Sequence, residues 1–404
     1  MKSSISYLEA RELVLAAVKP VETERVPLVR AAGRVLARDL AAGENVPPFD
    51  RSPYDGYAFR SADSQSASRE NPVTLRILEE IPAGGVSHVP VTAGTAVKVL
   101  TGAPIPPGAD AVTMFEKTEF TVETVTIFRT ARSGENIVRT GEDVQKGAIL
   151  AKAGTAIDAG LAGTLASQNI PQPEVYRIPR VGLISTGSEL VDVGEQLPPG
   201  KIYNSNQYTF AAVLDKLGCE VAYTAMAGDC TGAIRDRILE ALEICDLLIL
   251  TGGVSVGDYD LTPAAMELAG AEVLLRGVDL KPGMACAYAV KDGKLLCGLS
   301  GNPASSLTNF YAVACPAVRK LCGLAEYLPR EITVTLSDGF SKKSPSTRLL
   351  RGRLDLSHGT VRMSLPKDQG NVVLSSTIGC DVMAVIPAGS GPVNAGTELK
   401  GFLL

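Results

Sequence analysis

The chain has 404 residues, of which 45% are hydrophobic and 21% are charged. These values are typical of a globular protein with real hydrophobic cores, and the length predicts roughly two to three domains. The formal net charge of −5 excludes the strongly basic balance of proteins that grip nucleic acid through its phosphates. Charged residues interrupt the N-terminal segment and no window of about 18 apolar residues occurs, so we expect a cytoplasmic protein without a signal peptide or membrane span.

Few histidine and cysteine side chains are available for catalysis or metal binding. The chain has only two histidines, His88 and His358, and its eight cysteines form no C-x-x-C pair. Buried reduced thiols are therefore favoured over a zinc or disulfide framework. Charge chemistry must come from carboxylates, lysines, arginines and backbone amides, and oxygen-rich sites of this kind suit a hard cation such as Mg²⁺.

The first 178 residues predict a helix, then a β-rich region. Residues 6–18 have helical spacing, and Ser6 with Glu9 fits a capping box. A small helix is expected near residues 31–40. Residues from about 50 to 145 hold short β-rich runs separated by Gly and Pro, which indicates a small all-β domain. A helical piece rich in Ala and Gly follows between about 146 and 178.

Residues 180–323 alternate between strand and helix patterns. Apolar runs such as "RVGLIST" and "DLLILTG" predict strands, "TGAIRDRILEALEIC" predicts an amphipathic helix, and a long helix is expected from Pro303. This alternation predicts a largely parallel sheet covered on both faces. Residues from about 331 to 404 return to short strands with Gly and Pro turns, a second β domain.

Three loops rich in Gly or Ser follow apolar strands, at residues 185–189, 251–257 and 300–306. Ligands of open α/β sheets bind beyond the carboxyl ends of the strands, so the three loops are expected at one ligand-binding edge. The last loop opens a helix, whose free N–H groups favour an anion such as phosphate. None of the three is a Walker P-loop or a G-x-G-x-x-G motif, and tight turns remain an alternative reading of each.

Acidic residues lie near the same sheet edge: Glu189 in the first loop, Asp229 after the strand that ends near Ala227, and Asp258 and Asp260 after the strand that ends near Leu250. Taken singly, each is as readily a helix cap or a turn residue. Together they place carboxylates beside an expected phosphate site, which is how magnesium and a phosphorylated ligand are commonly held. The β region adds Asp55, Thr101 and Asp143 in Gly-flanked turns. The basic stretch "SKKSPSTRLLRGRL" reads better as a solvated strand edge than as an anion site.

Seven motifs, in order and in register, resemble those of the molybdopterin molybdenumtransferases, the MoeA proteins related to the C-terminal domain of gephyrin. The motifs are "RSPYDGYAFR", "LTGAPIPPGADAV", "RTGEDVQKG", "LISTGSELV", "TGGVSVGDYD", "LKPG" and "LSGNPAS". The resemblance covers residues 6 to about 390 and implies a multidomain α/β plus β fold. It implies an elongated segmented domain (1–45 and 146–178), an inserted β domain (46–145), a three-layer α/β molybdopterin-binding domain (179–327) and a C-terminal β-barrel (328–404).

The resemblance also implies a reaction: insertion of molybdenum from molybdate into adenylylated molybdopterin, with Mg²⁺ and release of AMP. Carried over position by position, the catalytic residues are Asp55, Asp143, Glu189, Asp229, Asp260 and Lys281, and Glu189, Asp229 and Asp260 are the metal ligands. The ligand-binding residues are Thr101, Thr186, Gly187, Gly252, Gly253, Ser255, Gly257, Gly301, Asn302 and Pro303.

The partners implied are a second copy of the chain, molybdopterin adenylyltransferase and proteins that mature molybdoenzymes, with no nucleic acid or membrane. In such dimers the β domain of one subunit faces the α/β domain of the other, so that Asp55, Thr101 and Asp143 complete the site.

The chain departs from the family pattern at Ser188, Met284, Ser300 and residues 379–381. Many relatives carry a second lysine at position 284, and its loss bears on oxyanion binding. Two alternatives remain: a non-catalytic scaffold or metal-delivery relative, and a molybdopterin adenylyltransferase.

Overall fold

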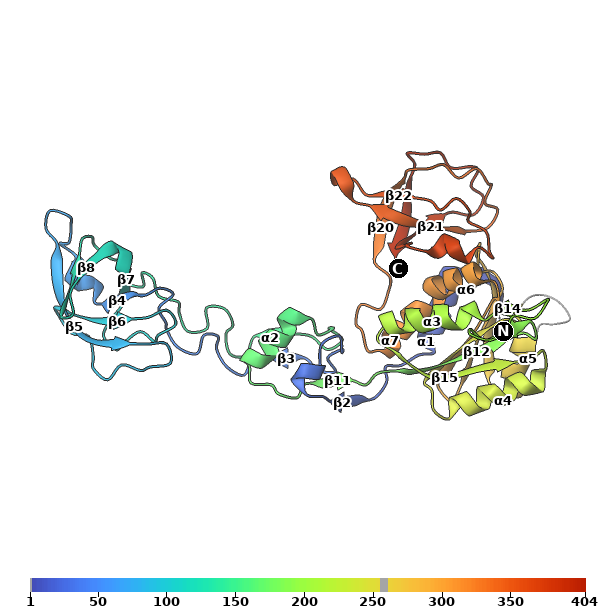
Figure 1. Ribbon diagram of the computed structural model, residues 1–404, viewed down its shortest axis with the longest axis horizontal. Helices are drawn as coiled ribbons and strands as arrows, with labels where there is room; N and C mark the ends of the chain where they lie inside the picture. Colours follow the sequence, from blue (N-terminus) through green and yellow to red (C-terminus); the bar gives the residue numbers. More distant parts are fainter. Residues whose placement is uncertain (1, 255–260) are drawn as a thin grey trace. The chain divides into compact units, whose positions relative to one another are not determined.

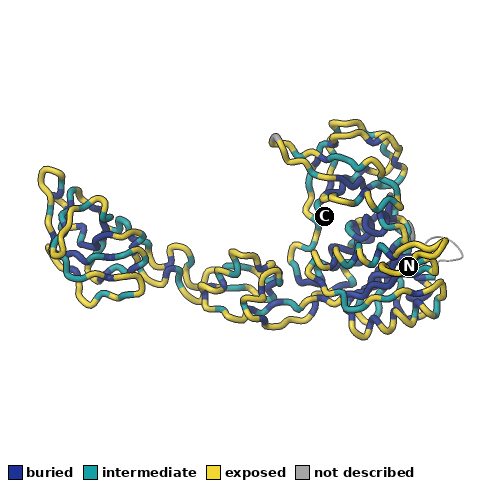
Figure 2. Tube along the Cα trace, viewed as in Figure 1, coloured by how far each residue is buried: buried dark blue, intermediate teal, exposed yellow. Residues whose placement is uncertain are grey.

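The computed structural model describes residues 2–254 and 261–404, and the chain divides into two compact units (Figure 1). The first unit comprises the residues up to Arg38, Ala153–Ala162 and Gln172–Leu404, and the second comprises Asp39–Lys152 and Gly163–Pro171. Each unit has its own buried core (Figure 2). Within the described ranges, no helix combines the length and apolar character that crossing a membrane requires.

A seven-stranded mixed sheet forms the centre of the first unit, in the order β1-β17-β18-β19-β16-β12-β15. Four neighbouring pairs are parallel, and the two pairs that involve β18 are antiparallel. The strands are β1 Lys2–Ser6, β12 Arg180–Thr186, β15 Glu220–Ala227, β16 Leu247–Thr251, β17 Glu272–Asp279, β18 Cys286–Lys291 and β19 Lys294–Leu299. The prediction of a largely parallel sheet is confirmed, and β18 and β19 form an antiparallel hairpin that turns at Asp292 and Gly293.

Helices cover both faces of this sheet (Figure 1). One core cluster joins one face of the sheet to α1 Tyr7–Ala16, α3 Ser205–Lys216 and the helical segment from Pro303 to Leu321. A second cluster joins the other face to α4 Thr231–Leu242 and α5 Leu261–Leu268. The central strand β16, "LLILT", is buried at every position because it has helices on both sides. The predicted three-layer arrangement is therefore confirmed.

The N-terminal segment supplies the edge strand β1, which sequence reasoning did not indicate. The Ser6 hydroxyl accepts a hydrogen bond from the Glu9 N–H at 3.1 Å, as the capping box predicted. The helix expected near residues 31–40 is wrong. There the chain forms turns and isolated bridges, Val35 with Ala156 and Leu36 with Val175, because pairing with a distant segment outweighs local helix propensity.

The long helix from Pro303 is interrupted. It consists of α6 Pro303–Asn309, a π-helical segment Phe310–Ala314 and α7 Cys315–Leu321. All seven α6 side chains except Pro303 are buried, so this helix lies inside the unit. Two small pairs complete the region: β2 Thr23–Arg25 with β11 Glu174–Tyr176, and β13 Leu190–Val191 with β14 Ile202–Tyr203.

The C-terminal strands close a barrel in the order β20-β22-β21-β23-β24. They are β20 Glu331–Leu336, β21 Arg348–Asp355, β22 Arg362–Ser364, β23 Val382–Ile386 and β24 Glu398–Leu403. One side of β21 and β23, with Leu349 and Met383, belongs to the core of the α/β layers, while the other side fills the barrel. The barrel strands therefore contribute to the core of the α/β layers and also enclose a core of their own.

The second unit contains a six-stranded sheet in the order β7-β4-β6-β5-β9-β8. Its strands are β4 Gly56–Phe59, β5 Val73–Ile81, β6 Thr95–Val99, β7 Ala111–Met114, β8 Thr118–Phe120 and β9 Thr124–Ile127. A small antiparallel pair, β3 Leu40–Ala41 with β10 Ile149–Ala151, precedes and follows this sheet in the chain. Helix α2 is Ala159–Ser167. The predicted domain boundaries remain predictions.

Candidate active site

A cavity of about 780 Å³ lies at the carboxyl edge of the seven-stranded sheet. Strands β12, β16 and β19 are neighbouring and parallel, so the loops that follow them meet there. Ten of the predicted site residues line this cavity: Thr186, Gly187, Glu189, Asp229, Gly252, Gly253, Lys281, Gly301, Asn302 and Pro303. The three loops identified from the sequence therefore converge on one cavity.

Glycine is required where β16 ends. Gly252 has a φ of 103° and Gly253 a φ of 61°, a region that side chains with a Cβ rarely adopt. A Cβ on Gly252 would lie 2.4 Å from the carbonyl oxygen of Thr186, and one on Gly253 would lie 2.7 Å from the Thr262 hydroxyl. These glycines bring the β16 loop close to the end of β12, which exposes backbone rather than side chain to the cavity.

Buried hydroxyls form hydrogen bonds where β12 and β16 end, next to the cavity. The Ser185 hydroxyl donates to Asn204 Oδ1 at 3.0 Å, and the Thr186 hydroxyl donates to the Thr251 carbonyl at 3.2 Å. The Thr262 hydroxyl donates to the Gly252 carbonyl at 2.8 Å. Because these groups are buried and paired with one another, they fix the ends of β12 and β16 relative to the start of α5.

Two exposed carboxylates, Glu189 and Asp229, stand at the rim of the cavity. The Ser188 N–H donates to Asp229 Oδ2 at 3.1 Å, and Lys201 donates to the Ser188 carbonyl. The hydroxyl and the N–H of Ser188, helped by the charge of Lys201, lower the pKa of Asp229. Asp229 is therefore a carboxylate at neutral pH.

The described residues contain no group of three or more His, Cys, Asp or Glu side chains placed to share a metal ion. Magnesium keeps several waters and is usually held by one or two carboxylates together with phosphate oxygens of a substrate. Of the three predicted metal ligands, Glu189 and Asp229 line this cavity.

Lys281 reaches the cavity from the loop between β17 and β18. Its backbone bridges to the barrel: the Lys281 N–H donates to the Thr347 carbonyl at 2.8 Å, and the Leu349 N–H donates to the Lys281 carbonyl at 2.9 Å. Gly283, with a φ of 109°, is held by Asn309, whose amide donates to the Gly283 carbonyl at 2.6 Å. The barrel and the long helix thus set the position of the lysine.

Met284 also lines the cavity, and 56% of its surface is exposed. Position 284, where the family resemblance leads us to expect a second lysine, therefore lies on the cavity wall near Lys281. The departure noted in the sequence leaves one cation fewer at this wall.

Two groups of cavity residues were missed by sequence reasoning. The first is the segment of five residues before and at the start of α3: Ile202, Tyr203, Asn204, Ser205 and Asn206. The run "YNSN" of small polar residues at a strand-to-helix junction was a usable signal. The second group is Asn371 and Val372, which come from the C-terminal region. Only the packing of the barrel against α6, with the Ala304 N–H donating to the Asn371 carbonyl at 3.1 Å, brings them there.

The remaining predicted residues lie elsewhere. In the second unit, Asp55 Oδ1 accepts hydrogen bonds from the Thr101 N–H at 2.6 Å and the Thr101 hydroxyl at 2.8 Å, and these lower the pKa of Asp55. Asp143 is exposed in the same unit, with its N–H donating to the Val46 carbonyl at 3.0 Å. Ser255, Gly257 and Asp260 lie outside the described residues.

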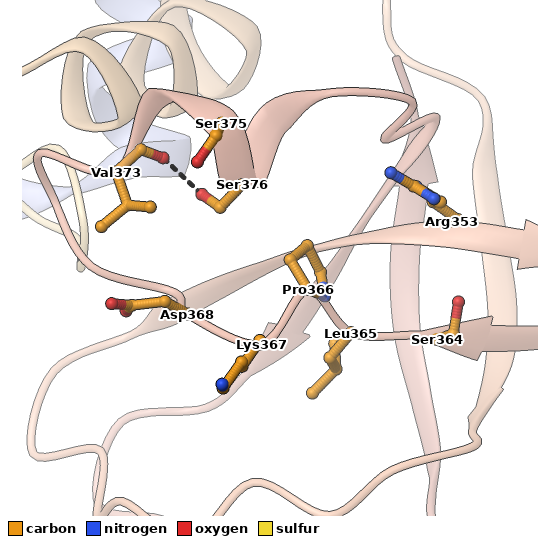
Figure 3. Close-up of a pocket in the computed structure, with 9 residues that line it drawn as sticks. All are labelled: Arg353, Ser364, Leu365, Pro366, Lys367, Asp368, Val373, Ser375 and Ser376. Atoms are coloured by element: carbon orange, nitrogen blue, oxygen red, sulfur yellow. Dashed lines mark hydrogen bonds between the residues drawn. The ribbon is translucent and has the colours of Figure 1, made fainter.

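A second cavity, of about 610 Å³, opens on the barrel (Figure 3). It contains none of the predicted residues, and its walls include Arg353, Lys367, Asp368 and the Val373–Ser376 turn, in which the Ser376 hydroxyl donates to the Val373 carbonyl. The neighbouring Arg351 is 1% exposed, and burial lowers its pKa. The reading of the basic stretch as a solvated edge is therefore wrong for Arg351, which donates to Ser376 Oγ at 3.0 Å.

The fold and the cavity define a class: an α/β protein with a ligand site at the carboxyl edge of its sheet, joined to flanking β domains. Family models match along most of the chain. The "MoeA N-terminal region (domain I and II)" matches residues 5–168, a "probable molybdopterin binding domain" matches residues 182–320, and the "MoeA C-terminal region (domain IV)" matches residues 333–404.

Individual proteins are similar over nearly their whole length. The molybdopterin molybdenumtransferase of Staphylococcus aureus strain Mu50 is 39% identical over 98% of this chain and 94% of its own. That of Staphylococcus epidermidis strain RP62A is 37% identical over 100% and 96%. The crystal structure of the MoeA protein of Pyrococcus horikoshii OT3 has a TM-score of 0.86 and 31% identity, covering 99% of this chain and 100% of that one. The chain belongs to the MoeA family of molybdopterin molybdenumtransferases.

Proposed function

We propose that this protein inserts molybdenum into adenylylated molybdopterin, taking molybdate as the second substrate and releasing AMP. Membership of a family whose relatives are named molybdopterin molybdenumtransferases supports a transferase of molybdenum cofactor biosynthesis. The release of AMP is proposed in addition, and it has to be measured directly in the reaction.

The observation that carries the proposal is the convergence of three kinds of group on one cavity. Glycine loops expose backbone to it, two carboxylates stand at its rim and Lys281 comes from the opposite loop. A volume of about 780 Å³ suits a ligand larger than a mononucleotide. The backbone and Lys281 suit the anionic phosphates and an oxyanion, and the carboxylates suit a hard cation.

Magnesium is proposed as the metal, with Glu189 and Asp229 as its ligands at the rim and Asp260 as a third. When bound, it would offset the negative charge of the phosphate linkage. The protein's own part is to keep Asp229 ionised through Ser188 and to hold Lys281 in place through the barrel. Asp260 is proposed to help orient the attacking water.

The test is AMP release from adenylylated molybdopterin with molybdate and Mg²⁺, measured for the wild type and for Glu189→Gln. We expect the variant to lose at least about tenfold in rate, since it removes one charge beside the phosphates. Glu243→Gln, which changes an exposed carboxylate at the end of α4, should retain full rate. Equal rates for wild type, Glu189→Gln and Asp260→Asn would refute these carboxylate roles. Consumption of ATP without AMP release from the adenylylated substrate would instead favour the adenylyltransferase alternative.

We also propose that the protein acts as a homodimer in which Asp55, Thr101 and Asp143 of one subunit complete the site of the other. The Asp55–Thr101 hydrogen bonds support a preformed polar group in the second unit. Mixing inactive Asp55→Asn and Glu189→Gln proteins should then restore part of the activity, because a mixed dimer regains one intact site. Each variant mixed with itself is the control, and no recovery in the exchanged mixture would contradict the shared site.

Further partners proposed are molybdopterin adenylyltransferase, as the source of the substrate, and proteins that mature molybdoenzymes. A cytoplasmic location is proposed as well, because eight cysteines that are all free suit a reducing compartment.

A further inference from the structure

Asn206 presents a buried hydrogen-bond acceptor for which the described residues supply no donor. The residue is 8% exposed, lies in the first turn of α3 and lines the large cavity. Its side-chain oxygen Oδ1 is shielded from water and has no hydrogen-bond partner in the part of the chain that the structure describes. A buried acceptor left without a donor costs free energy, so native structures usually supply one.

The orientation of the Asn206 amide follows from its other contact. Nδ2 donates to the Gly301 carbonyl at 2.8 Å, and a carbonyl can only accept. The nitrogen must therefore face Gly301, and the oxygen is the atom that remains free. Gly301 belongs to the loop after β19. Asn206 therefore contacts a predicted ligand-binding loop through Nδ2, while Oδ1 has no hydrogen bond to the described residues.

The segment that carries Asn206 also brings an aromatic side chain to the cavity. Tyr203 lines the same cavity with 43% of its surface exposed, and its hydroxyl donates to the Glu195 carbonyl at 3.1 Å. This hydrogen bond anchors the ring, whose face can stack on a planar heterocycle. The same short segment thus combines an aromatic surface with an acceptor for an N–H group.

We propose that Asn206 is a specificity-determining residue that accepts a hydrogen bond from the amino group of a planar nitrogen heterocycle, with Tyr203 stacking on that ring. The inference rests on the proposed function, whose substrate carries two such rings, a pterin and an adenine. Both present an exocyclic amino group, and the experiment below distinguishes them.

The test compares ligands that differ only in the amino group. Equilibrium binding of AMP is compared with that of purine riboside 5′-monophosphate, and binding of pterin with that of 2-deaminopterin, in wild type and in Asn206→Leu. In the wild type we expect the amino group of one pair to tighten binding about five- to tenfold, the value of one buried hydrogen bond. In Asn206→Leu this ratio falls to about one, and the pair that responds identifies the ring.

The controls separate recognition from a structural role. If Asn206 only held the Gly301 loop, its loss would weaken both members of each pair equally and leave the ratios unchanged, which would overturn the proposal. If Asn206→Leu does not fold, Asn206→Ser replaces it, since it also removes Oδ1 and is smaller. Thr209→Val, on the same helix, should leave the binding ratios as in the wild type. No turnover or molybdate is needed, so a failure here leaves the proposed insertion reaction standing, and a failure of that reaction leaves these ratios informative.

Discussion

At the residue scale, the site consists of small residues, which leave room for a ligand, and a few charged residues placed to contact it. Gly252 and Gly253 adopt backbone angles that exclude other residues, which explains why the stretch after β16 lacks bulk. Ser188, a departure from the family pattern, has a role here, since it lowers the pKa of Asp229. Met284, a further departure, lines the cavity and has an uncharged side chain that cannot replace the charge of a lysine.

The Met284→Lys substitution should improve oxyanion binding. A lysine at this exposed cavity position would add a second cation near Lys281, and we expect the molybdate concentration for half-maximal rate to fall about three- to tenfold. The readout is AMP release as a function of molybdate concentration. Leu268→Lys is a matched control, because Leu268 is 55% exposed, against 56% for Met284, and lies outside the cavity lining. An unchanged molybdate dependence would show that position 284 does not contact the oxyanion.

At the element scale, the loop that carries Lys281 depends on a buried relay from β18 to α6. The Tyr288 hydroxyl donates to Asn309 Oδ1 at 2.5 Å, and the Asn309 amide donates to the Gly283 carbonyl at 2.6 Å. Both side chains are fully buried, and burial raises the pKa of Tyr288 well above its ordinary value, so the phenol stays protonated as a donor. The sequence predicted the strand, the loop and the helix, but it gave no sign that this relay joins them.

Tyr288→Phe should therefore destabilise the protein and loosen the loop. The substitution leaves Asn309 Oδ1 buried without a donor, which costs about 1–3 kcal/mol in the free energy of unfolding. Because Lys281 lies two residues before Gly283, the KM for molybdate should rise together with the loss of stability. Denaturant unfolding and AMP release measure the two effects. Tyr311→Phe, whose hydroxyl makes no hydrogen bond to the described residues, should change neither. Unaltered stability in Tyr288→Phe would argue against the relay.

At the scale of the whole molecule, ion pairs join segments that are distant in the chain. Arg177 makes two hydrogen bonds of 2.7 Å to the carboxylate of Asp246 and a third to Glu22. Burial by itself would raise the pKa of Asp246, but the hydrogen bonds from Arg177 and from the Arg180 N–H outweigh it, so the pKa lies below its ordinary value. This cluster connects the start of β12 and the start of β16 to the β2–β11 pair within the first unit.

Asp246→Asn should lower stability in a manner that depends on pH. Because the pKa of Asp246 is lower in the folded chain, the charged form contributes stability at every pH above the ordinary value of 3.8, and the contribution is lost as the pH falls through the folded pKa. At pH 7 we expect a loss of about 1–2 kcal/mol, allowing for the partial exposure of the pair. Urea unfolding at pH 7 and at a pH below the folded pKa of Asp246 measures the difference, with Asp215→Asn as the exposed control. A loss that is the same at both pH values would rule out the charge as its origin.

The sequence by itself determined the alternation of strands and helices between residues 180 and 323 and the three loops of the cavity, because apolar periodicity and glycine placement are local signals. The resemblance to the MoeA proteins predicted ten residues that line the cavity, and the three loops meet there because parallel strands bring their carboxyl ends to one edge. Only the tertiary structure decided that β1 completes the sheet, that residues 31–40 form bridges instead of a helix, and that Asn371 and Val372 reach the cavity. Those outcomes depend on pairing and packing between segments far apart in the chain, and the free acceptor of Asn206 is visible only once every neighbouring donor has been placed.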